Sequence, residues 1–183
     1  MSFGARKALI GLALTTVALG LAAPVGFWFL SLAVDRALGL GPVISAPAAL
    51  ILAAAAILVG VFWITWSYSY LVFVGKGVPL EVFGHALHPT SVLVTTGPYA
   101  YSRNPMVLGL LFVLLGVAFL RRSVAGLVLA PLIAALTATY LAEFEERALV
   151  KRFGADYEEY RHNVPMLIPR LTPYIHQSAA TQR

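Results

Sequence analysis

The chain has 183 residues, of which 60% are hydrophobic and only 11% are Asp, Glu, Lys or Arg. In soluble domains roughly a quarter of the residues are charged. This composition therefore excludes an ordinary water-soluble protein and indicates an integral membrane protein. The length suits a single domain over residues 1–183. The net charge of +5 does not indicate nucleic-acid binding, because basic residues of membrane proteins collect in cytoplasmic loops. The lack of cysteine excludes disulfides, thiolate nucleophiles and Cys-ligated metals.

Long runs without charged side chains predict four transmembrane helices. The first two runs exceed the roughly 20 residues that cross a hydrocarbon core, and the last two are shorter and form a carboxy-terminal hairpin. The predicted spans are residues 8–34, 46–74, 104–120 and 123–142. The predicted fold class is therefore an all-α integral membrane protein with four transmembrane helices and a cytoplasmic tail helix.

The first two helices carry local signals of their own. Pro24 and Gly26 predict a kink in the first helix. The apolar run after Arg6 resembles a secretory signal, but it is too long for one, so we expect it to be retained. The second helix ends in the aromatic segment 63–70, which fits a belt at the membrane–water interface or, alternatively, the lining of a cation or lipid cavity.

The connection over residues 75–103 is rich in glycine and proline, and connections of this length are often functional. The third helix is expected to begin near Pro105. The fourth begins near Ser123 and continues out of the membrane to about Phe153, where Gly154 ends it. Asp156, with a glutamate three residues later, predicts a capping box that opens a short tail helix over residues 157–162.

The distribution of the thirteen lysines and arginines predicts the orientation. With four crossings, only Arg36, Arg121 and Arg122 fall on the side opposite the amino terminus, so both termini and the charged segments near them should be cytoplasmic. Arg121-Arg122 either caps a full crossing or belongs to a hairpin that stops short of the far surface. The bias toward Ala, Gly, Leu and Val favours a bacterial protein, hence the bacterial inner membrane.

Acidic residues follow the last transmembrane helix. Glu143, Glu146 and Arg147 share one helix face, whereas Glu145 points elsewhere. One interpretation is an exposed Glu143–Arg147 pair worth a few tenths of a kcal/mol. The other is a ligand site, because a carboxylate near hydrocarbon is costly unless it is paired.

An arginine and several tyrosines flank the same hairpin. The planar fork of Arg103 suits a carboxylate, or else the side chain extends to the surface to set orientation. Aromatic rings attract a sulfonium, or else anchor the protein at the interface. The tyrosines concerned are Tyr99, Tyr101, Tyr157 and Tyr160. His85 and His88 lack a third ligand, so no metal site is expected.

Several segments together resemble the isoprenylcysteine carboxyl methyltransferase family and the related phospholipid methyltransferases. They are residues 97–109 (GPYAYSRNPMVLG), Glu145-Glu146, residues 152–160 (RFGADYEEY) and residues 164–169 (VPMLIP). The resemblance covers residues 89–170, which would be the cofactor-binding region. It implies S-adenosylmethionine at the cytoplasmic side and a lipophilic substrate that enters from the bilayer, with membrane lipids as the surroundings.

By position, the family's motifs fall on Arg103, Asn104, Pro105, Glu145, Glu146, Tyr157 and Tyr160, which are the implied cofactor-binding residues. Tyr99 joins them because its ring would help to frame the sulfonium. The chemistry of methyl transfer makes Arg103 and Glu146 the expected catalytic residues: Arg103 would orient a carboxylate acceptor, and Glu146 or Glu143 would accept a proton from an amine or thiol. Asn104 stands where the family has histidine and Val107 where it has tyrosine, so the methyl acceptor does not follow from the family.

The sequence therefore predicts a membrane methyltransferase that uses S-adenosylmethionine and acts on a lipophilic acceptor. Within the same superfamily, the alternatives are a phospholipid N-methyltransferase and a small-thiol methyltransferase. Two other classes stay open: an NADPH-dependent membrane reductase with a similar hairpin, and a non-catalytic lipid-binding scaffold. The reductase would need more basic residues near the pocket to hold the extra phosphate.

Overall fold

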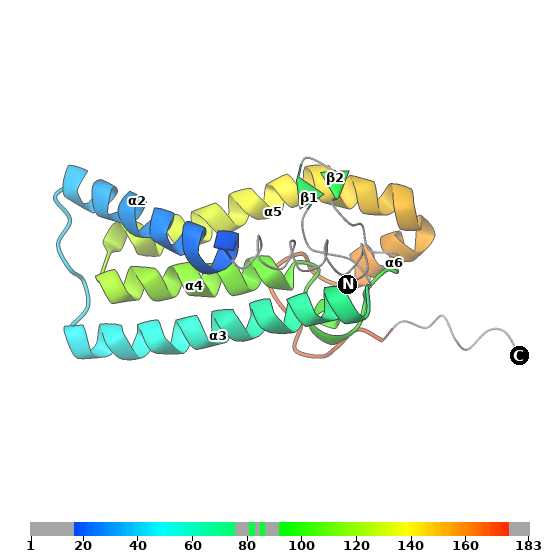
Figure 1. The fold of residues 1–183 in the computed structure, drawn as a ribbon, viewed down its shortest axis with the longest axis horizontal. Coiled ribbons are helices and arrows are strands. Elements are labelled where there is room, and N and C mark those ends of the chain that lie inside the picture. The colour runs from blue at the N-terminus through cyan, green and yellow to red at the C-terminus, as the bar shows by residue number, and fades with distance from the viewer. Residues whose placement is uncertain (1–16, 76–80, 83–84, 87–91, 176–183) are drawn as a thin grey trace, which may run out of the picture.

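The computed structural model describes residues 17–75, 81–82, 85–86 and 92–175 (Figure 1). Its elements in chain order are η1 (Ala18–Ala22), α2 (Ala23–Ala37), α3 (Ala46–Phe73), β1 (Glu81–Val82), β2 (His85–Ala86), η2 (Gly97–Ala100), α4 (Pro105–Arg121), α5 (Val124–Phe153) and α6 (Ala155–Asn163). The two short strands pair antiparallel, with Glu81 opposite Ala86. The described chain is thus all-helical apart from this small hairpin, as predicted.

Among the described helices, α3 and α5 are long and apolar enough to cross a membrane, and α4 is a shorter apolar helix. The predicted second and third spans agree with α3 and α4 to within a residue. The predicted fourth helix is α5, which begins at Val124 directly after its N-cap residue Ser123 and runs to Phe153 as expected. The Ser123 hydroxyl accepts a hydrogen bond from the Gly126 N–H at 2.8 Å. Four crossings stay a prediction, because the first predicted span begins outside the described residues.

The first described helix contains an irregular turn at the place where the sequence predicts a kink. The π-helical segment η1 directly precedes α2, whose second residue is Pro24. Proline has no N–H and its ring clashes with the carbonyl four residues earlier, so a regular α-helical turn is disfavoured there. A π-turn relieves that conflict. The helix then continues to Ala37, slightly beyond the predicted end.

The helices α3 and α4 approach closely through small residues. A Cβ added to Gly60 would lie 2.6 Å from the carbonyl oxygen of Gly109, and one added to Gly109 would lie 2.8 Å from that of Gly60. Both distances are too short for a real Cβ, so the two backbones touch at this crossing. Small residues allow such contact between transmembrane helices. This close crossing fixes the position of α4 relative to α3. The first residue of α4 is Pro105, directly after the candidate site residues Arg103 and Asn104.

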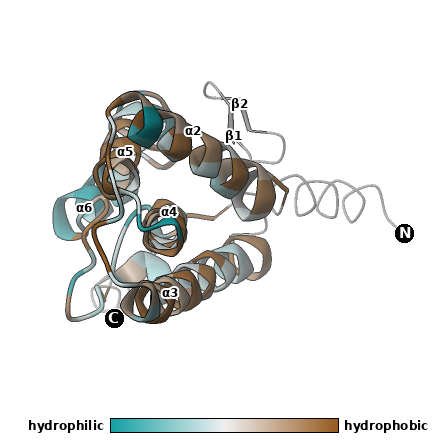
Figure 2. Cartoon of the chain, turned by 90° about the vertical axis from the view of Figure 1, so that its left-hand side faces the viewer, coloured by the Kyte–Doolittle hydropathy of each residue, from teal (hydrophilic) through white to brown (hydrophobic). Residues whose placement is uncertain are grey.

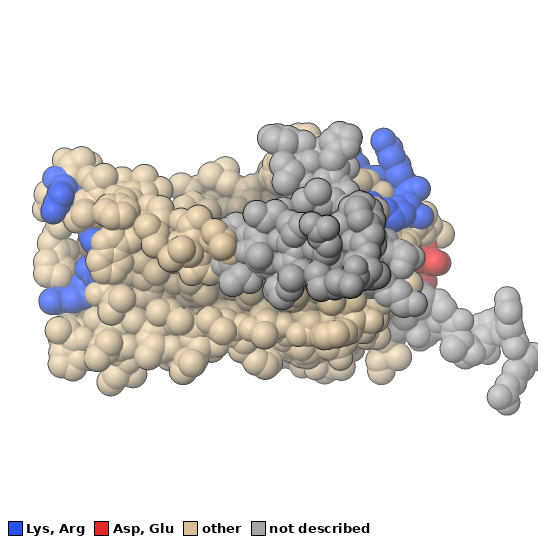
Figure 3. Space-filling view, viewed as in Figure 1, with Lys and Arg blue, Asp and Glu red and all other residues tan. Residues whose placement is uncertain are grey.

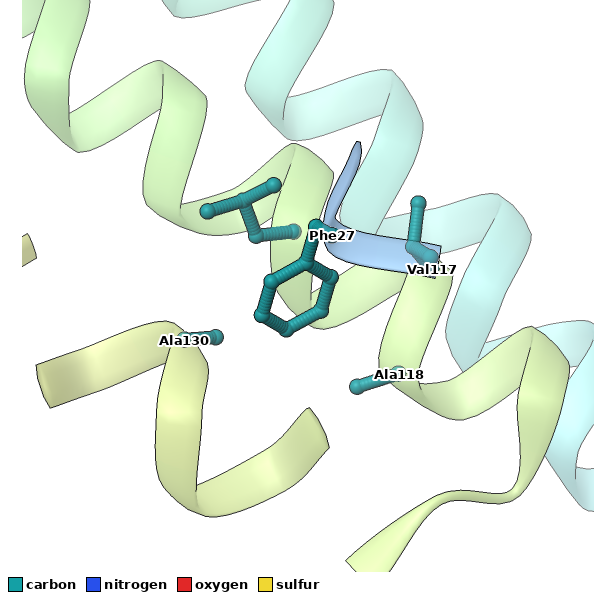
Figure 4. Packing of buried hydrophobic residues seen from close by; sticks show 5 residues of the cluster. Phe27, Val117, Ala118 and Ala130 are labelled. Carbon is teal, nitrogen blue, oxygen red and sulfur yellow. The ribbon is translucent and has the colours of Figure 1, made fainter. Parts of the chain in front are cut away.

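Buried apolar side chains join α2 to the hairpin of α4 and α5 (Figure 4). Phe27 is 3% exposed and packs with Leu114, Val117, Ala118 and Ala130. A second buried cluster of Tyr157, Tyr160 and Val164 lies at the other end of the hairpin, around α6. The first cluster holds α2, α4 and α5 together. The second cluster packs α6 against the end of α5.

The surface has charged ends and an apolar middle. Figure 2 shows apolar residues along α2 and α3, and Figure 3 shows lysines and arginines at both ends of the visible face with none between them in its described part. Many large apolar side chains are exposed, including Ile51 at 70% and Leu58 at 71%. Water disfavours such a surface, whereas a bilayer accommodates it. The arrangement supports a membrane protein.

Candidate active site

Arg103 lies between η2 and α4, where its side chain turns into the protein. Its guanidinium forms an ion pair with Glu146 of α5, and both side chains are about nine-tenths buried. The Arg103 Nε donates to the Val164 carbonyl at 2.9 Å, and its backbone N–H donates to the Pro165 carbonyl at 2.9 Å. Arg103 therefore joins the start of α4 to α5 and to the segment after α6.

Glu146 is the buried carboxylate at the centre of this arrangement. Besides Arg103, it has the guanidinium of Arg161 on α6 at 3.9 Å. Burial raises the pKa of Glu146, and the two guanidiniums and the Tyr157 hydroxyl oppose that rise. A carboxyl with a raised pKa is a better proton acceptor near neutral pH than an exposed one. Arg161 was not among the site residues predicted from the sequence.

The other acids of this helix have different surroundings. Glu143 pairs with Arg147 one turn later, and both side chains are largely exposed. This is the simple helix-end pair that the sequence allowed. Glu145 is half-buried and contributes to raising the pKa of Tyr157. Glu146 is in direct contact with Arg103.

Three tyrosines pack around the ion pair. Tyr99 is 8% exposed, and Tyr157 and Tyr160 are each 2% exposed. The Tyr160 hydroxyl donates to the Tyr99 carbonyl at 2.7 Å, and the rings of Tyr157 and Tyr160 are 6.0 Å apart. Burial raises the pKa of all three phenols, so they stay protonated and neutral at physiological pH. Tyr101 is separate, because its ring packs against Trp66 instead.

The tail, defined here as residues 164–174 after α6, folds back over residues 99–104 before α4. The backbone N–H of Asn104 donates to the Met166 carbonyl at 3.0 Å, that of Arg170 to the Tyr101 carbonyl at 2.9 Å, and that of Tyr174 to the Ala100 carbonyl at 2.9 Å. The Asn104 side-chain amide donates to the same Met166 carbonyl at 3.2 Å. Asn104 therefore anchors the tail, while Pro105 is fully buried at the first position of α4.

Ser102 is a buried residue of this contact that sequence reasoning missed. Its side chain is fully buried, and its hydroxyl lies 3.2 Å from the Met166 carbonyl and 3.1 Å from the Leu167 carbonyl. The only signal in the sequence is its position directly before Arg103. Pairing between residues 99–104 and the tail depends on tertiary packing, which spacing alone does not reveal.

The predicted capping box at Asp156 is wrong. Gly154, with φ 55° and ψ −128°, ends α5 and is also the residue before α6, and α6 has no side-chain cap. Because α5 and α6 are separated by Gly154 alone, Asp156 already lies inside the first turn of α6. There its carboxylate suits the positive end of the helix dipole. The early start places Tyr157 and Tyr160 against α5.

No group of three metal-ligating side chains occurs in the described residues. His88 lies outside them, and only the backbone of His85 is described. The arrangement nevertheless offers a buried guanidinium, a buried carboxylate and neutral aromatic rings within one cluster. Such a set can bind a ligand that carries both a carboxylate and an amine, because each charged group meets its opposite.

The fold and this cluster define an all-helical, membrane-type protein with a buried polar site at one end of its apolar helices. Residues 48–156 match the family described as Phospholipid methyltransferase. The match covers more than half of the chain, so the chain belongs to the phospholipid methyltransferase family. It includes Tyr99, Arg103, Glu145 and Glu146, and it ends just before Tyr157.

Two curated proteins are similar to parts of the chain. Methanethiol S-methyltransferase 2 of Bradyrhizobium diazoefficiens is 38% identical over 73 residues, which are 40% of this chain and 27% of that protein. The cobalt-zinc-cadmium resistance protein CzcN of Cupriavidus metallidurans is 31% identical over 125 residues, which are 64% of this chain and 57% of that protein. The chain thus matches about a quarter and somewhat over half of these relatives' lengths. No solved structure matches the chain. The family and the first relative's name support a methyltransferase.

Proposed function

We propose that the protein is a membrane methyltransferase that binds S-adenosylmethionine at the Arg103–Glu146 cluster and methylates a lipophilic acceptor. The observation that carries the proposal is the buried contact between Arg103 and Glu146, made by residues inside the matched family segment. The two opposite charges lie together in one buried cluster, so a ligand that carries both a carboxylate and an amine would find a partner for each.

The donor set fits this cofactor. The guanidinium of Arg103 would hold the carboxylate of its amino-acid end, and Glu146 would hold the amine. The buried tyrosines Tyr99 and Tyr157 would face the sulfonium, since aromatic rings attract a cation. Glu145, half-buried on the same helix, would complete the polar contacts, with Asn104, Pro105 and Tyr160 shaping the site through the tail.

When bound, S-adenosylmethionine supplies an electrophilic methyl group on a sulfonium. The residues of the chain contribute position, exclusion of water and proton transfer. A carboxylate acceptor needs no base, and Arg103 would orient it. An amine or thiol acceptor must lose its N–H or S–H proton as the new bond to carbon forms, and Glu146 would accept that proton at a carboxylate oxygen. Glu143 is less suited to this role, because its carboxylate is exposed and paired with Arg147.

The charge distribution supports a cytoplasmic site. Basic side chains near the cluster come from α5, α6 and the tail, whereas the opposite end carries Arg36, Arg121 and Arg122. The residues on the site's side are Arg103, Arg147, Lys151, Arg152, Arg161 and Arg170. Basic residues are enriched on the cytoplasmic side of membrane proteins. We therefore place the site at the cytoplasmic face of a bacterial inner membrane, with the acceptor entering from the bilayer.

A small thiol is the second candidate acceptor. It is favoured by the similarity to a protein named Methanethiol S-methyltransferase 2. Glu146 would serve this reaction as the proton acceptor, as it would for an aminophospholipid. The two candidates differ in where the product is found, because a methylated small thiol leaves the membrane and a methylated lipid stays in it.

The proposal is tested by incubating the protein in bilayer discs with methyl-labelled S-adenosylmethionine. The acceptors offered would be aminophospholipid, a prenylated cysteine and methanethiol. We expect label in one acceptor class, strongly reduced in Glu146→Gln and retained in Glu143→Gln, whose exposed carboxylate serves as the matched control. Equal labelling by both variants would contradict the role of Glu146. No labelling of any acceptor, with no cofactor bound, would favour the non-catalytic scaffold.

A further inference from the structure

The end of the helices opposite the candidate active site holds an arginine with one unpaired buried donor. The Arg121 side chain is only 11% exposed, and its nearest acid, Asp35 of α2, is 3.6 Å away, beyond ordinary hydrogen-bond length. Its Nε is buried and has no hydrogen-bond partner among the described residues. Its guanidinium lies 5.0 Å from the centre of the Trp28 ring. A buried donor without a partner is costly, and the 3.6 Å ion pair with Asp35 leaves it unmet, so this position suits an anionic ligand.

An apolar groove leads to this arginine. It is lined by Pro24, Val25, Trp28 and Phe29 of α2 and by Val117 of α4. Trp28 belongs both to the groove and to the contact with Arg121, and Val117 precedes Arg121 by about one helical turn. Phe29 is 62% exposed, so the groove opens to the surroundings of the helices. Trp28 thus connects the apolar groove to the Arg121 guanidinium.

The charges at this end are mostly positive. The charged residues of the described elements that meet here are Asp35, Arg36, Arg121 and Arg122. Arg36 is exposed, and Arg122 donates through Nε to the Ile44 carbonyl at 2.5 Å. The single acid is already engaged, because its Oδ1 accepts from the Ala125 N–H at 3.0 Å. Figure 3 shows the resulting group of basic side chains at the end of the molecule away from α6.

We propose that this groove and Arg121 form a binding site for one acidic phospholipid. An acyl chain would lie against Val25, Phe29 and Val117, and the phosphate would accept hydrogen bonds from the Arg121 guanidinium. The excess of positive charge favours an acidic over a zwitterionic head group, since each nearby basic residue contributes about 1 kcal/mol to acidic-lipid binding. The site is separate from the Arg103 cluster and does not depend on the proposed activity.

The test is native mass spectrometry of the full chain released from micelles. Phosphatidylglycerol, phosphatidylcholine and glycerol 3-phosphate would be offered separately. We expect one phosphatidylglycerol to be retained, with about fivefold to tenfold weaker retention of phosphatidylcholine and no retention of glycerol 3-phosphate. Equal retention of the two lipids, or binding of glycerol 3-phosphate as tight as that of the lipid, would overturn the proposal. So would a dimer without lipid, in which a second copy covers the groove.

Two substitutions should act in opposite directions. Arg121→Gln removes the phosphate partner and should abolish the preference for phosphatidylglycerol. Asp35→Asn keeps an oxygen to accept from the Ala125 N–H but removes the competing negative charge, so it should tighten phosphatidylglycerol binding about fivefold. Arg36→Gln, which removes an equal charge from an exposed position, serves as the control and should cost less than Arg121→Gln.

A purely structural role for the Asp35–Arg121 contact predicts a different pattern. Both variants would then lower the melting temperature without changing lipid selectivity. If Arg121→Gln does not fold, Asp35→Asn decides the matter by itself. Unchanged or weaker binding of phosphatidylglycerol by Asp35→Asn would overturn the proposal.

Discussion

Glu143 and Glu146 are less than one helical turn apart on α5, yet they differ in surroundings. Glu143 is exposed beside Arg147, whereas Glu146 is buried against Arg103. An exposed pair contributes little to stability, but removing one partner of a buried pair leaves a costly charge behind. The two positions therefore form a natural comparison for any experiment on this helix.

The raised pKa of Glu146 predicts a pH dependence of stability. Burial disfavours the ionised carboxylate in the folded state more than in the unfolded state. The contribution of this group is then fully present below its ordinary pKa of 4.5 and is lost as the pH rises through the higher folded value. Compared with Glu146→Gln, the parent protein should lose stability as the pH rises through this window. Thermal unfolding of both proteins in micelles across that range measures the effect.

A difference between the two proteins that does not change with pH would contradict this prediction. A difference that grows in favour of the parent protein as the pH rises would show that the guanidiniums outweigh burial.

Ser102 should stabilise the tail through its buried hydroxyl. Ser102→Ala removes this donor from the Leu167 carbonyl, while the Met166 carbonyl keeps its bonds from Asn104. The loss should cost about 1–3 kcal/mol of unfolding free energy. It should also speed hydrogen exchange in residues 164–170. Ser69→Ala is the control, because the Ser69 hydroxyl bonds only to the Thr65 carbonyl of its own helix, and it should cost at most about 0.5 kcal/mol. Equal exchange rates in the two variants would remove Ser102 from the tail contact.

At the scale of elements, α3 and α4 cross with their backbones in contact at Gly60 and Gly109. Gly60→Ala would place a Cβ 2.6 Å from the Gly109 carbonyl oxygen, so the helices must separate. We expect a loss of about 1–3 kcal/mol in unfolding free energy, the usual cost of overpacking. Because α4 begins beside Arg103, the same change should weaken ligand binding at the candidate site.

The control for this crossing is Gly26→Ala. A Cβ at Gly26 would meet nothing within 4 Å, and alanine favours a helix by roughly 0.5–1 kcal/mol over glycine. Its stability should be unchanged or higher. Denaturant titration in mixed micelles compares the two variants, and equal losses would mean that the glycines act through helix propensity instead of close approach.

The helices themselves could be predicted well, because long apolar runs and terminal signals are local. Gly154 is an example: a glycine after a charged helical stretch predicted the end of α5, and its positive φ of 55° explains why. The start of α6 could not be predicted from the sequence. Asp156 and Glu159 have the spacing of a capping box, which predicted a helix that begins at residue 157, whereas α6 begins at Ala155. The π-turn before Pro24 was foreseen only as a kink.

At the scale of the whole molecule, the candidate site depends on contacts between distant parts of the chain. Arg103, Glu146 and the two buried tyrosines of α6 were assigned from the sequence to one cofactor site near one membrane surface. The individual contacts among them were not foreseeable from spacing, because they require the segment after α6 to fold back on residues 99–104. Arg161 was missed for the same reason, since it reaches Glu146 only through the placement of α6 against α5.

The distribution of charged and apolar side chains is also a property of the whole molecule. The described surface has basic groups at both ends and apolar side chains between them (Figures 2 and 3). This pattern suits a protein held across a bilayer, with the Arg103 cluster at one membrane surface and Arg121 at the other. The two proposed ligands, a charged cofactor and an acidic lipid, would therefore bind at opposite surfaces.

The central claim is that the Arg103–Glu146 cluster binds S-adenosylmethionine. Isothermal calorimetry of the protein in bilayer discs tests it most directly, with NADPH titrated alongside and Glu146→Gln and Glu143→Gln as matched variants. The account predicts binding of S-adenosylmethionine but not of NADPH, weakened about tenfold or more in Glu146→Gln and unchanged in Glu143→Gln. Absence of binding by the folded protein, binding of NADPH instead, or equal affinity in both variants would contradict it.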